Sequence, residues 1–288
     1  MFITRLISGI FLLAFTILFV YWGGVPLLAV LAFISTVGFL ELTKAVGITR
    51  DAGGINFLEA VGILGIFGIY SCQILAVMQG HAVDVVYLMG AIVFTIIGML
   101  AVYVATFPKY NATQVVEVVF AFMYAPVMLS FIGMTRALPD IGSRAVWMIW
   151  ISAWGSDTFA YVVGMLTGKT IGNHKAFPVL SPKKSIEGCI GGIVGAALLG
   201  GLFGKYIMGA DYGNIVLGVI CGIGSVIAQC GDLAASAIKR NFQIKDYGKC
   251  IPGHGGILDR FDSIIFTAPC IYFLMYFFLD IKYLFTMY

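Results

Sequence analysis

Charged side chains are scarce in this sequence. Lys and Arg number 17 and Asp and Glu number 14 among 288 residues, whereas 60% of the residues are hydrophobic. That balance excludes an ordinary soluble domain and is typical of a polytopic membrane protein, as is the mean hydropathy of +1.00. The net charge of +3 is too small to indicate a nucleic-acid partner, so we expect none.

Paired cysteines are also lacking. The six cysteines are well separated and none forms a Cys-x-x-Cys pair, so the sequence indicates neither a zinc site nor a disulfide framework. A P-loop is excluded too, because Gly168-Lys-Thr does not complete the Gly-x4-Gly-Lys-Ser/Thr spacing. Any phosphate or metal site must therefore be built from other residues.

The sequence does contain a series of long apolar runs. A membrane-spanning helix needs about 20 apolar residues, and the bilayer interior leaves the backbone no partner outside a helix or a closed barrel. The runs are too long and continuous for barrel strands, so we predict an all-α, polytopic integral membrane protein. The first run has no convincing cleavage site and is interpreted as a membrane helix rather than a signal peptide. About nine transmembrane helices are expected, near residues 5–22, 26–44, 57–78, 83–105, 113–134, 145–166, 187–208, 214–238 and 262–284.

Lys and Arg are distributed unevenly between the two sides that nine spans define. Thirteen lie on the side of the N-terminus and of the loops after even-numbered spans, and four lie on the other side. The positive-inside rule assigns the first side to the cytoplasm. Without the two basic loops, 169–184 and 239–260, the count is four against four, so the predicted orientation depends on those loops.

The chain divides into two regions of different character. Residues 1–138 are interpreted as membrane helices for anchoring and lipid access, and residues 139–288 as the catalytic membrane region. In the first region, Glu41, Glu59 and Glu117 lie near predicted helix ends. A carboxylate at such an interface is more often solvated than functional, and that is the interpretation adopted for all three.

Polar residues gather near the C-terminus, between Ser236 and Asp262. Cations that bind phosphate, beside carboxylates that bind a divalent metal ion, are typical of phosphoryl and nucleotidyl transfer. The glycines around His254 predict a tight turn between the last two helices. The segment contains five cations and three carboxylates, which are Lys239, Arg240, Lys245, Lys249, Arg260, Asp246, Asp259 and Asp262.

Carboxylates from two helix ends are expected to converge around this turn. Asp232, Ser236 and Lys239 follow an i, i+4, i+7 spacing and share one helix face, and Asp259 and Asp262 share another. Oxygen ligands alone favour Mg²⁺ or another hard cation over zinc. The alternative is that Asp–Lys and Asp–Arg pairs only fix the hairpin between the helices. The preferred metal ligands are Asp232 and Asp259, with Asp262 and Asp246 as second choices.

Two upstream elements are expected to contribute to the same site. Asp157 lies inside an apolar run, where a charge costs at least ~2.5–3.5 kcal/mol, so we expect it to face a wet cavity or a partner. Ser181-Pro-Lys-Lys-Ser185 is interpreted as the cap and opening turn of the next helix. Backbone donors there, together with Lys183 and Lys184, would bind an anion. The alternative is ordinary positive-inside charge.

At these residues the sequence resembles the phosphatidate cytidylyltransferase family, the CDP-diacylglycerol synthases. The family pattern is Ser-x-apolar-Lys-Arg, four residues, Lys-Asp-x-small, two residues, apolar-Pro-x-His-Gly-Gly-apolar-x-Asp-Arg-apolar-Asp. Every fixed position of this pattern is present from Ser236 to Asp262.

Two further motifs extend the resemblance, which covers about residues 155–265. Residues 181–188 are similar to the family's Ser-Pro-Lys-Lys-Thr-x-Glu-Gly, with Ser185 replacing Thr and keeping its hydroxyl. Asp157, followed by Ala160 and Tyr161, fits the family's Asp-x-x-Ala-Tyr element.

The resemblance implies that the protein transfers CMP from CTP to phosphatidate, giving CDP-diacylglycerol and pyrophosphate for phospholipid biosynthesis. It implies a Mg²⁺-dependent, homodimeric enzyme in the lipid bilayer, with its active site at the cytoplasmic ends of the C-terminal helices. A bacterial inner membrane is expected because the chain is short. Each candidate residue then has an expected role. Lys239, Arg240, Lys245 and Arg260 hold phosphates of lipid or nucleotide, and Ser181, Lys183, Lys184 and Ser185 hold CTP. Ser236 and His254 position reacting groups, and Asp157 supports the cations or joins the metal site.

Two other functions remain as alternatives. A CTP-dependent lipid kinase acting on a polyprenol or phytol would also be polytopic and use acidic and basic loops, but it would release CDP. An ion-coupled transporter would bind its ion with intramembrane carboxylates. The transporter alternative predicts an internal repeat and charges near mid-bilayer in several helices, whereas this sequence shows no repeat and its charges gather on one side.

Overall fold

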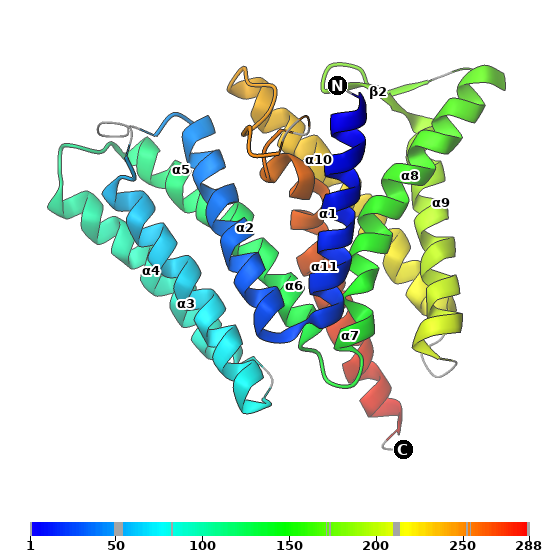
Figure 1. Cartoon of the computed structure of the whole chain (residues 1–288), viewed down its shortest axis with the longest axis horizontal. Helices are drawn as coiled ribbons and strands as arrows, with labels where there is room; N and C mark the ends of the chain where they lie inside the picture. The colour runs from blue at the N-terminus through cyan, green and yellow to red at the C-terminus, as the bar shows by residue number, and fades with distance from the viewer. Residues whose placement is uncertain are drawn as a thin grey trace. The chain divides into compact units, whose positions relative to one another are not determined.

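The computed structural model describes residues 2–48, 54–81, 83–170, 172, 174–209, 214–251, 253 and 255–286. Helices make up most of these ranges, which confirms the all-α prediction (Figure 1). The chain forms two compact units: Met1–Ala137 with Phe242–Arg260, and Leu138–Asn241 with Phe261–Tyr288. Residues 242–260 of the polar motif thus belong to the same unit as the N-terminal helices.

The first unit contains the N-terminal membrane helices. Asn56 is the N-cap of helix α3 and forms a capping box with Glu59, and α4 packs along α3 (Figure 1). Phe39 and Phe122 meet edge to face in the apolar core, with ring centroids 6.5 Å apart. The helices are α1 (Phe2–Trp22), α2 (Gly24–Ala45), α3 (Phe57–Gln79), α4 (Val85–Ala105), α5 (Ala112–Phe122), the π-helix η2 (Met123–Val127) and α6 (Met128–Arg136).

Helices α5 and α6 form one continuous helical segment across the π-helical turn η2. Pro126 lies inside this turn and has no N–H to donate to the helix ladder, which accounts for the local change in hydrogen bonding. The turn is buried, so the polar backbone groups it frees stay inside the unit.

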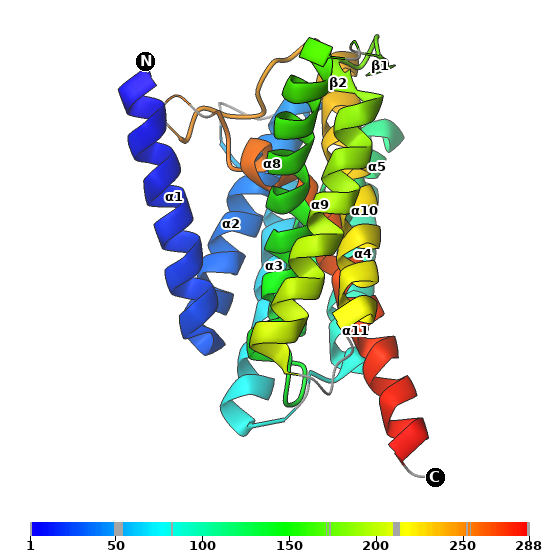
Figure 2. The ribbon, with the colours of Figure 1, turned by 90° about the vertical axis from the view of Figure 1, so that its right-hand side faces the viewer.

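The second unit is built around three long helices that lie side by side, α8, α9 and α10 (Figure 2). Glycines of α9 allow the close approach: a Cβ added at Gly192 would lie 2.8 Å from the carbonyl oxygen of Ser156, and one at Gly200 would lie 3.0 Å from that of Leu217. The elements are α7 (Gly142–Ala145), α8 (Trp147–Thr170), β1 (Lys175–Phe177), β2 (Ser181–Ser185), α9 (Ile186–Phe203), η3 (Gly204–Met208), α10 (Asn214–Asn241) and α11 (Leu258–Thr286).

All nine predicted apolar runs coincide with helices in the described residues. Seven of the described helices are long and apolar enough to cross a membrane: Gly24–Ala45, Phe57–Gln79, Val85–Ala105, Ala112–Arg136, Ile186–Met208, Asn214–Asn241 and Leu258–Phe278. The chain is thus a polytopic integral membrane protein. Helix α1 is also apolar over Ile7–Trp22, and α8, which carries Asp157, is not among these seven helices. The number of spans beyond seven stays a prediction.

The segment before α9 differs from its prediction. Ser181–Ser185 is not the opening turn of a helix but strand β2, which pairs with β1 in an antiparallel ribbon. The helix begins only after Ser185, whose hydroxyl caps it by accepting a hydrogen bond from the Gly188 N–H at 3.1 Å. Lys183 and Lys184 consequently lie in an extended strand rather than in the first turn of a helix.

Candidate active site

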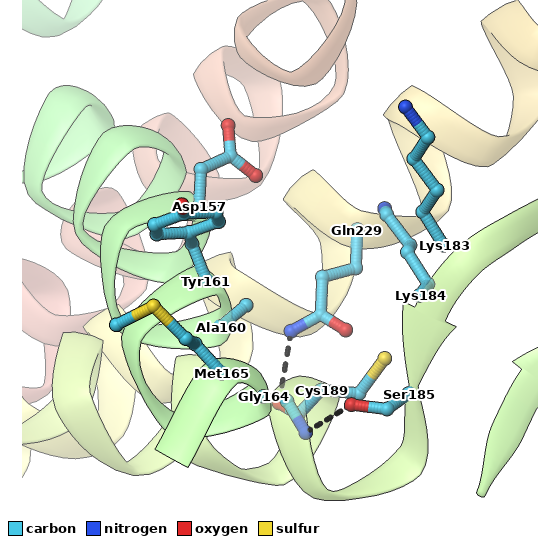
Figure 3. A pocket seen from close by; sticks show the side chains of 11 residues that line it. Asp157, Ala160, Tyr161, Gly164, Met165, Lys183, Lys184, Ser185, Cys189 and Gln229 are labelled. Carbon is cyan, nitrogen blue, oxygen red and sulfur yellow. Dashed lines mark hydrogen bonds between the residues drawn. The ribbon is translucent and has the colours of Figure 1, made fainter. Parts of the chain in front are cut away.

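A cavity of about 380 Å³ lies in the second unit, between α8, β2, α9 and α10. Figure 3 shows Asp157 and Tyr161 of α8 on one side of it, and Lys183 and Lys184 of β2 on the other. Met165 adds apolar surface next to Tyr161. The cavity therefore combines an apolar wall with two cations and a carboxylate, as a site for an amphipathic phosphate ester requires.

Lys184 forms an ion pair with Asp232 of α10, with Nζ 2.5 Å from Oδ2. Both side chains are only partly exposed, so this pair is screened less than a surface pair. Sequence reasoning had assigned the lysine to CTP and the aspartate to a metal ion. The structure joins these two residues directly.

Two further aspartates share the electrostatic environment of this pair. Asp157 interacts with both Asp232 and Lys184. Asp262 of α11 interacts with Asp232, Lys239 and Asp157. Three carboxylates from three helices are thus gathered with two lysines, and like charges held together in this way need a counter-ion or a proton.

The donor chemistry of this cluster suits a hard divalent cation, because its carboxylates offer only oxygen and outnumber the lysines. Within the described ranges, no group of three or more His, Cys, Asp or Glu side chains is arranged so that it could hold a metal ion as it stands. One oxygen of Asp232 is already held by Lys184. The metal site therefore stays a prediction.

A buried polar network supports the wall of the cavity. The side-chain amide of Gln229 donates to Ser156 Oγ and to the carbonyl oxygen of Cys189, both at 3.1 Å. Ser225 donates to the same Ser156 hydroxyl at 2.8 Å. These contacts tie α8, α9 and α10 together next to the lysines. Sequence reasoning missed Gln229, since a single uncharged amide in an apolar run gives no distinctive signal.

Asp259 lies in the first unit and has an inward-facing carboxylate. Its Oδ2 accepts hydrogen bonds from the N–H groups of Tyr247 and Gly256, both at 2.9 Å, and the residue is only 7% exposed. Asp259 therefore fixes the loop that precedes it, and its role as a metal ligand stays a prediction.

The loop 242–257 forms the predicted tight turn in its described residues. Ile251 pairs with Gly255 as an isolated bridge, and both Gly253 and Gly255 have positive φ, at 78° and 87°. Lys245 and Asp246 point outward as exposed side chains. His254, which was expected to position a reacting group, lies outside the described residues.

The remaining predicted residues lie along the same elements. Ser236 and Lys239 are half-buried on α10 and Arg240 is exposed, so their shared helix is confirmed but their contacts with substrate stay predictions. Arg260 is half-buried, and within the described residues its buried Nε has no hydrogen-bond partner. Ser181 pairs with Phe177 at the start of β2.

The solvated interpretation of two N-terminal glutamates is wrong. Glu41 is 7% exposed, and its carboxylate accepts from the N–H groups of Ile257 at 3.1 Å and Leu258 at 2.9 Å. Glu59 is fully buried and accepts from Thr43 Oγ1 at 2.6 Å and from the Asn56 N–H at 3.1 Å. Sequence reasoning missed these contacts because position near a helix end does not reveal the partner.

The chain is similar to known enzymes over most of its length. It is 28% identical over 271 residues to the phosphatidate cytidylyltransferase of Bacillus subtilis, covering 94% of this chain and 96% of that relative. It is 30% identical over 228 residues to the enzyme of that name in Staphylococcus epidermidis, covering 78% and 84% of the two chains. The corresponding values for Staphylococcus aureus are 31% over 224 residues, with 77% and 81% covered.

The sequence profile of the family described as the cytidylyltransferase family matches residues 3–278. This range includes the cavity, the Lys184–Asp232 pair and the whole polar motif of residues 236–262. The chain belongs to the cytidylyltransferase family, and it is a membrane-embedded nucleotidyltransferase.

Proposed function

We propose that this protein is a CTP:phosphatidate cytidylyltransferase, which makes CDP-diacylglycerol. The observation that carries the proposal is the cavity in which Lys183 and Lys184 face the apolar side chains of Tyr161 and Met165. A lipid phosphate needs both kinds of surface at once. The similarity to enzymes named phosphatidate cytidylyltransferase supports the same substrates.

The reaction is a substitution at phosphorus. A phosphate oxygen of phosphatidate attacks the α-phosphorus of CTP, the bond from that phosphorus to the oxygen bridging to the β-phosphate breaks, and pyrophosphate leaves with the electron pair. The attacking phosphate is largely ionised at neutral pH, because its second pKa is about 6. No strong general base is needed, and the protein's main tasks are to hold two anions together and to stabilise the developing charge.

The residues of the cluster divide these tasks between them. Lys183 and Lys184 bind phosphate oxygens at the cavity, and Asp232 holds Lys184 in place before substrate arrives. Lys239 offsets the charge of Asp262. Arg240 supplies a further cation on α10, and the phosphate-binding roles expected for Lys245 and Arg260 stay predictions from the family resemblance.

The oxygen-only donor set of Asp157, Asp232 and Asp262 suits Mg²⁺ chemically. These side chains would have to rearrange to hold the ion, because no group of three in the described residues is already arranged for one. When bound, it would polarise the phosphates and neutralise charge on the leaving pyrophosphate. Asp259 contributes by holding the motif loop in the first unit.

The proposal also covers the orientation of the protein in the membrane and its assembly into a homodimer. The basic loops 169–184 and 239–260 favour a cytoplasmic active site, where CTP is available. The bacterial relatives support an inner-membrane location. The homodimer remains an expectation from the family resemblance, and mass photometry of the detergent-purified protein would measure it.

Product analysis with several acceptors tests the proposal. The purified protein is incubated with Mg²⁺, CTP labelled at the α-phosphate, and phosphatidate, diacylglycerol or a polyprenol. We expect label in the lipid phase with phosphatidate alone, and loss of that label with EDTA. CDP release that requires a polyprenol would instead identify a CTP-dependent lipid kinase. Absence of turnover with all three acceptors, in folded protein, would contradict both enzyme functions.

A further inference from the structure

The carboxylate of Glu41, in the last turns of α2, contacts the beginning of α11 more than 200 residues later in the chain. One oxygen accepts from the Ile257 N–H and the other from the Leu258 N–H. Leu258 is the first residue of α11. The first N–H groups of a helix have no partner within it, and they carry the positive end of the helix dipole. A glutamate from another helix supplies both an acceptor and a complementary charge.

The backbone of the loop 242–257 packs so closely against the Glu41 carboxylate that a side chain at two of its glycines would collide with it. A Cβ added at Gly248 would lie 2.0 Å from Glu41 Oε1, and one added at Gly256 would lie 2.5 Å from Oε2. Both glycines belong to the loop 242–257. Their lack of side chains has a specific physical reason, which is the close approach of a carboxylate from α2.

The same first turn of α11 carries two residues of the polar motif, Asp259 and Arg260. Asp259 closes the arrangement by accepting from the Tyr247 and Gly256 N–H groups. Gly256 thus lies between the two carboxylates, donating to Asp259 and packing against Glu41. Moving the start of α11 would therefore move Asp259, Arg260 and the loop together.

We propose that Glu41 is a positioning residue for the transfer reaction, because it anchors the start of α11 and so fixes Asp259 and Arg260. The proposal rests on the proposed function for its catalytic consequence. Glu41 itself touches no reacting group. It acts through the backbone of the motif, and a displacement of about 1 Å in such a motif can cost about a hundredfold in rate.

Glu41→Gln tests the proposal with little change in shape. The amide keeps one acceptor oxygen but turns its NH₂ toward the second backbone donor, and it removes the charge. We expect kcat to fall about ten- to a hundredfold, with the KM for CTP within about threefold of wild type, because the cavity lysines lie on β2 and are unchanged.

Glu59→Gln is the matched control. Glu59 is also a buried carboxylate of the first unit, but its hydrogen bonds go to Thr43 and to Asn56, at the start of α3. We expect it to lower thermal stability while the kcat of the folded enzyme stays near that of wild type. An equal fall in kcat for both variants would overturn the proposal, because any buried carboxylate would then have the same effect.

Cys250 offers a readout that does not depend on activity. Partial burial raises the pKa of its thiol, and the nearby Glu41 carboxylate raises the pKa further. Removing the negative charge should lower the pKa and increase the thiolate fraction at about pH 8, since an ordinary thiol has a pKa of about 8.5. Iodoacetamide labelling, followed at the Cys250 peptide by mass spectrometry, should be faster in Glu41→Gln than in wild type or Glu59→Gln.

The combined results separate the two proposals. Faster Cys250 labelling with the fall in kcat supports the positioning role. Unchanged labelling, or wild-type kcat in Glu41→Gln, overturns it. If Glu41→Gln does not fold, Gly248→Ala, which crowds the same carboxylate, is measured in its place, and wild-type kcat in that variant likewise overturns the role. Wild-type protein without cytidylyl transfer would refute the proposed function, while the labelling would still report whether Glu41 anchors the loop.

Discussion

At the scale of single residues, the proposed phosphate binding depends most on the ion pair of Lys184 and Asp232. An ammonium held by a carboxylate at 2.5 Å is oriented before any phosphate binds. The pair also makes the two residues interdependent, because removing either leaves the other partly buried and without its counter-charge. Their contributions to catalysis should therefore be coupled rather than additive.

A double-mutant cycle measures this coupling. We expect Lys184→Met and Asp232→Asn each to lower kcat/KM for CTP at least a hundredfold, and the double variant to lose much less than the product of the two. The matched control is Lys205→Met, since the Lys205 ammonium lies over the Tyr206 ring, away from the cavity. Strictly multiplicative losses would show that the pair does not work as a unit.

At the scale of elements, the glycines of α9 set the distances between the helices that carry the site. Gly192 faces the carbonyl oxygen of Ser156, which belongs to the network that holds Gln229. Backbone cannot move aside as a flexible side chain can. These glycines therefore allow close packing within the second unit, and a change there should reach the cavity wall through Ser156.

Gly192→Ala tests this packing. The added Cβ would lie 2.8 Å from the Ser156 carbonyl oxygen, so we expect a loss of about 1–3 kcal/mol, seen as a lower melting temperature in detergent. Gly90→Ala in α4 is the control, because no atom lies within 4 Å of its added Cβ. There the better helix propensity of alanine should leave stability unchanged or raise it by up to ~1 kcal/mol. Equal effects of the two substitutions would contradict the packing argument.

Helices could be predicted from the sequence because the residues that specify them lie next to one another in the chain. Apolar runs specify helices because the bilayer leaves the backbone no alternative. The β1–β2 ribbon was missed, since a Lys-Lys pair after a serine and proline suits a helix start as well as a strand. Glu41 was misinterpreted because its partners are 216 and 217 residues away, and no local pattern contains them.

At the scale of the whole molecule, the proposed reaction requires the basic loops 169–184 and 239–260 to lie on the cytoplasmic side of the membrane. The charge bias that supports this orientation comes from the loops that form the proposed site, so an independent measurement is valuable. Cys250 is exposed in one of these loops, and His81 is exposed between α3 and α4, on the side predicted to be opposite.

Sidedness can be measured with a membrane-impermeant maleimide. We expect Cys250 to react in inverted inner-membrane vesicles and to be protected in intact spheroplasts, with the labelled residue identified by peptide mass spectrometry. A cysteine introduced by His81→Cys should show the reverse pattern. Labelling of Cys250 from outside intact spheroplasts would invert the predicted topology and separate the site from cytoplasmic CTP.

The position of the transferred label shows directly whether the protein transfers CMP or a phosphoryl group from CTP. Wild-type protein and Asp232→Asn are incubated with phosphatidate and with CTP labelled at either the α- or the γ-phosphate. The account predicts that α-label enters the lipid, that γ-label is released as pyrophosphate, and that Asp232→Asn abolishes both in parallel. Lipid that carries γ-label would identify phosphoryl transfer instead, and full activity in Asp232→Asn would contradict the role of the carboxylate–lysine cluster.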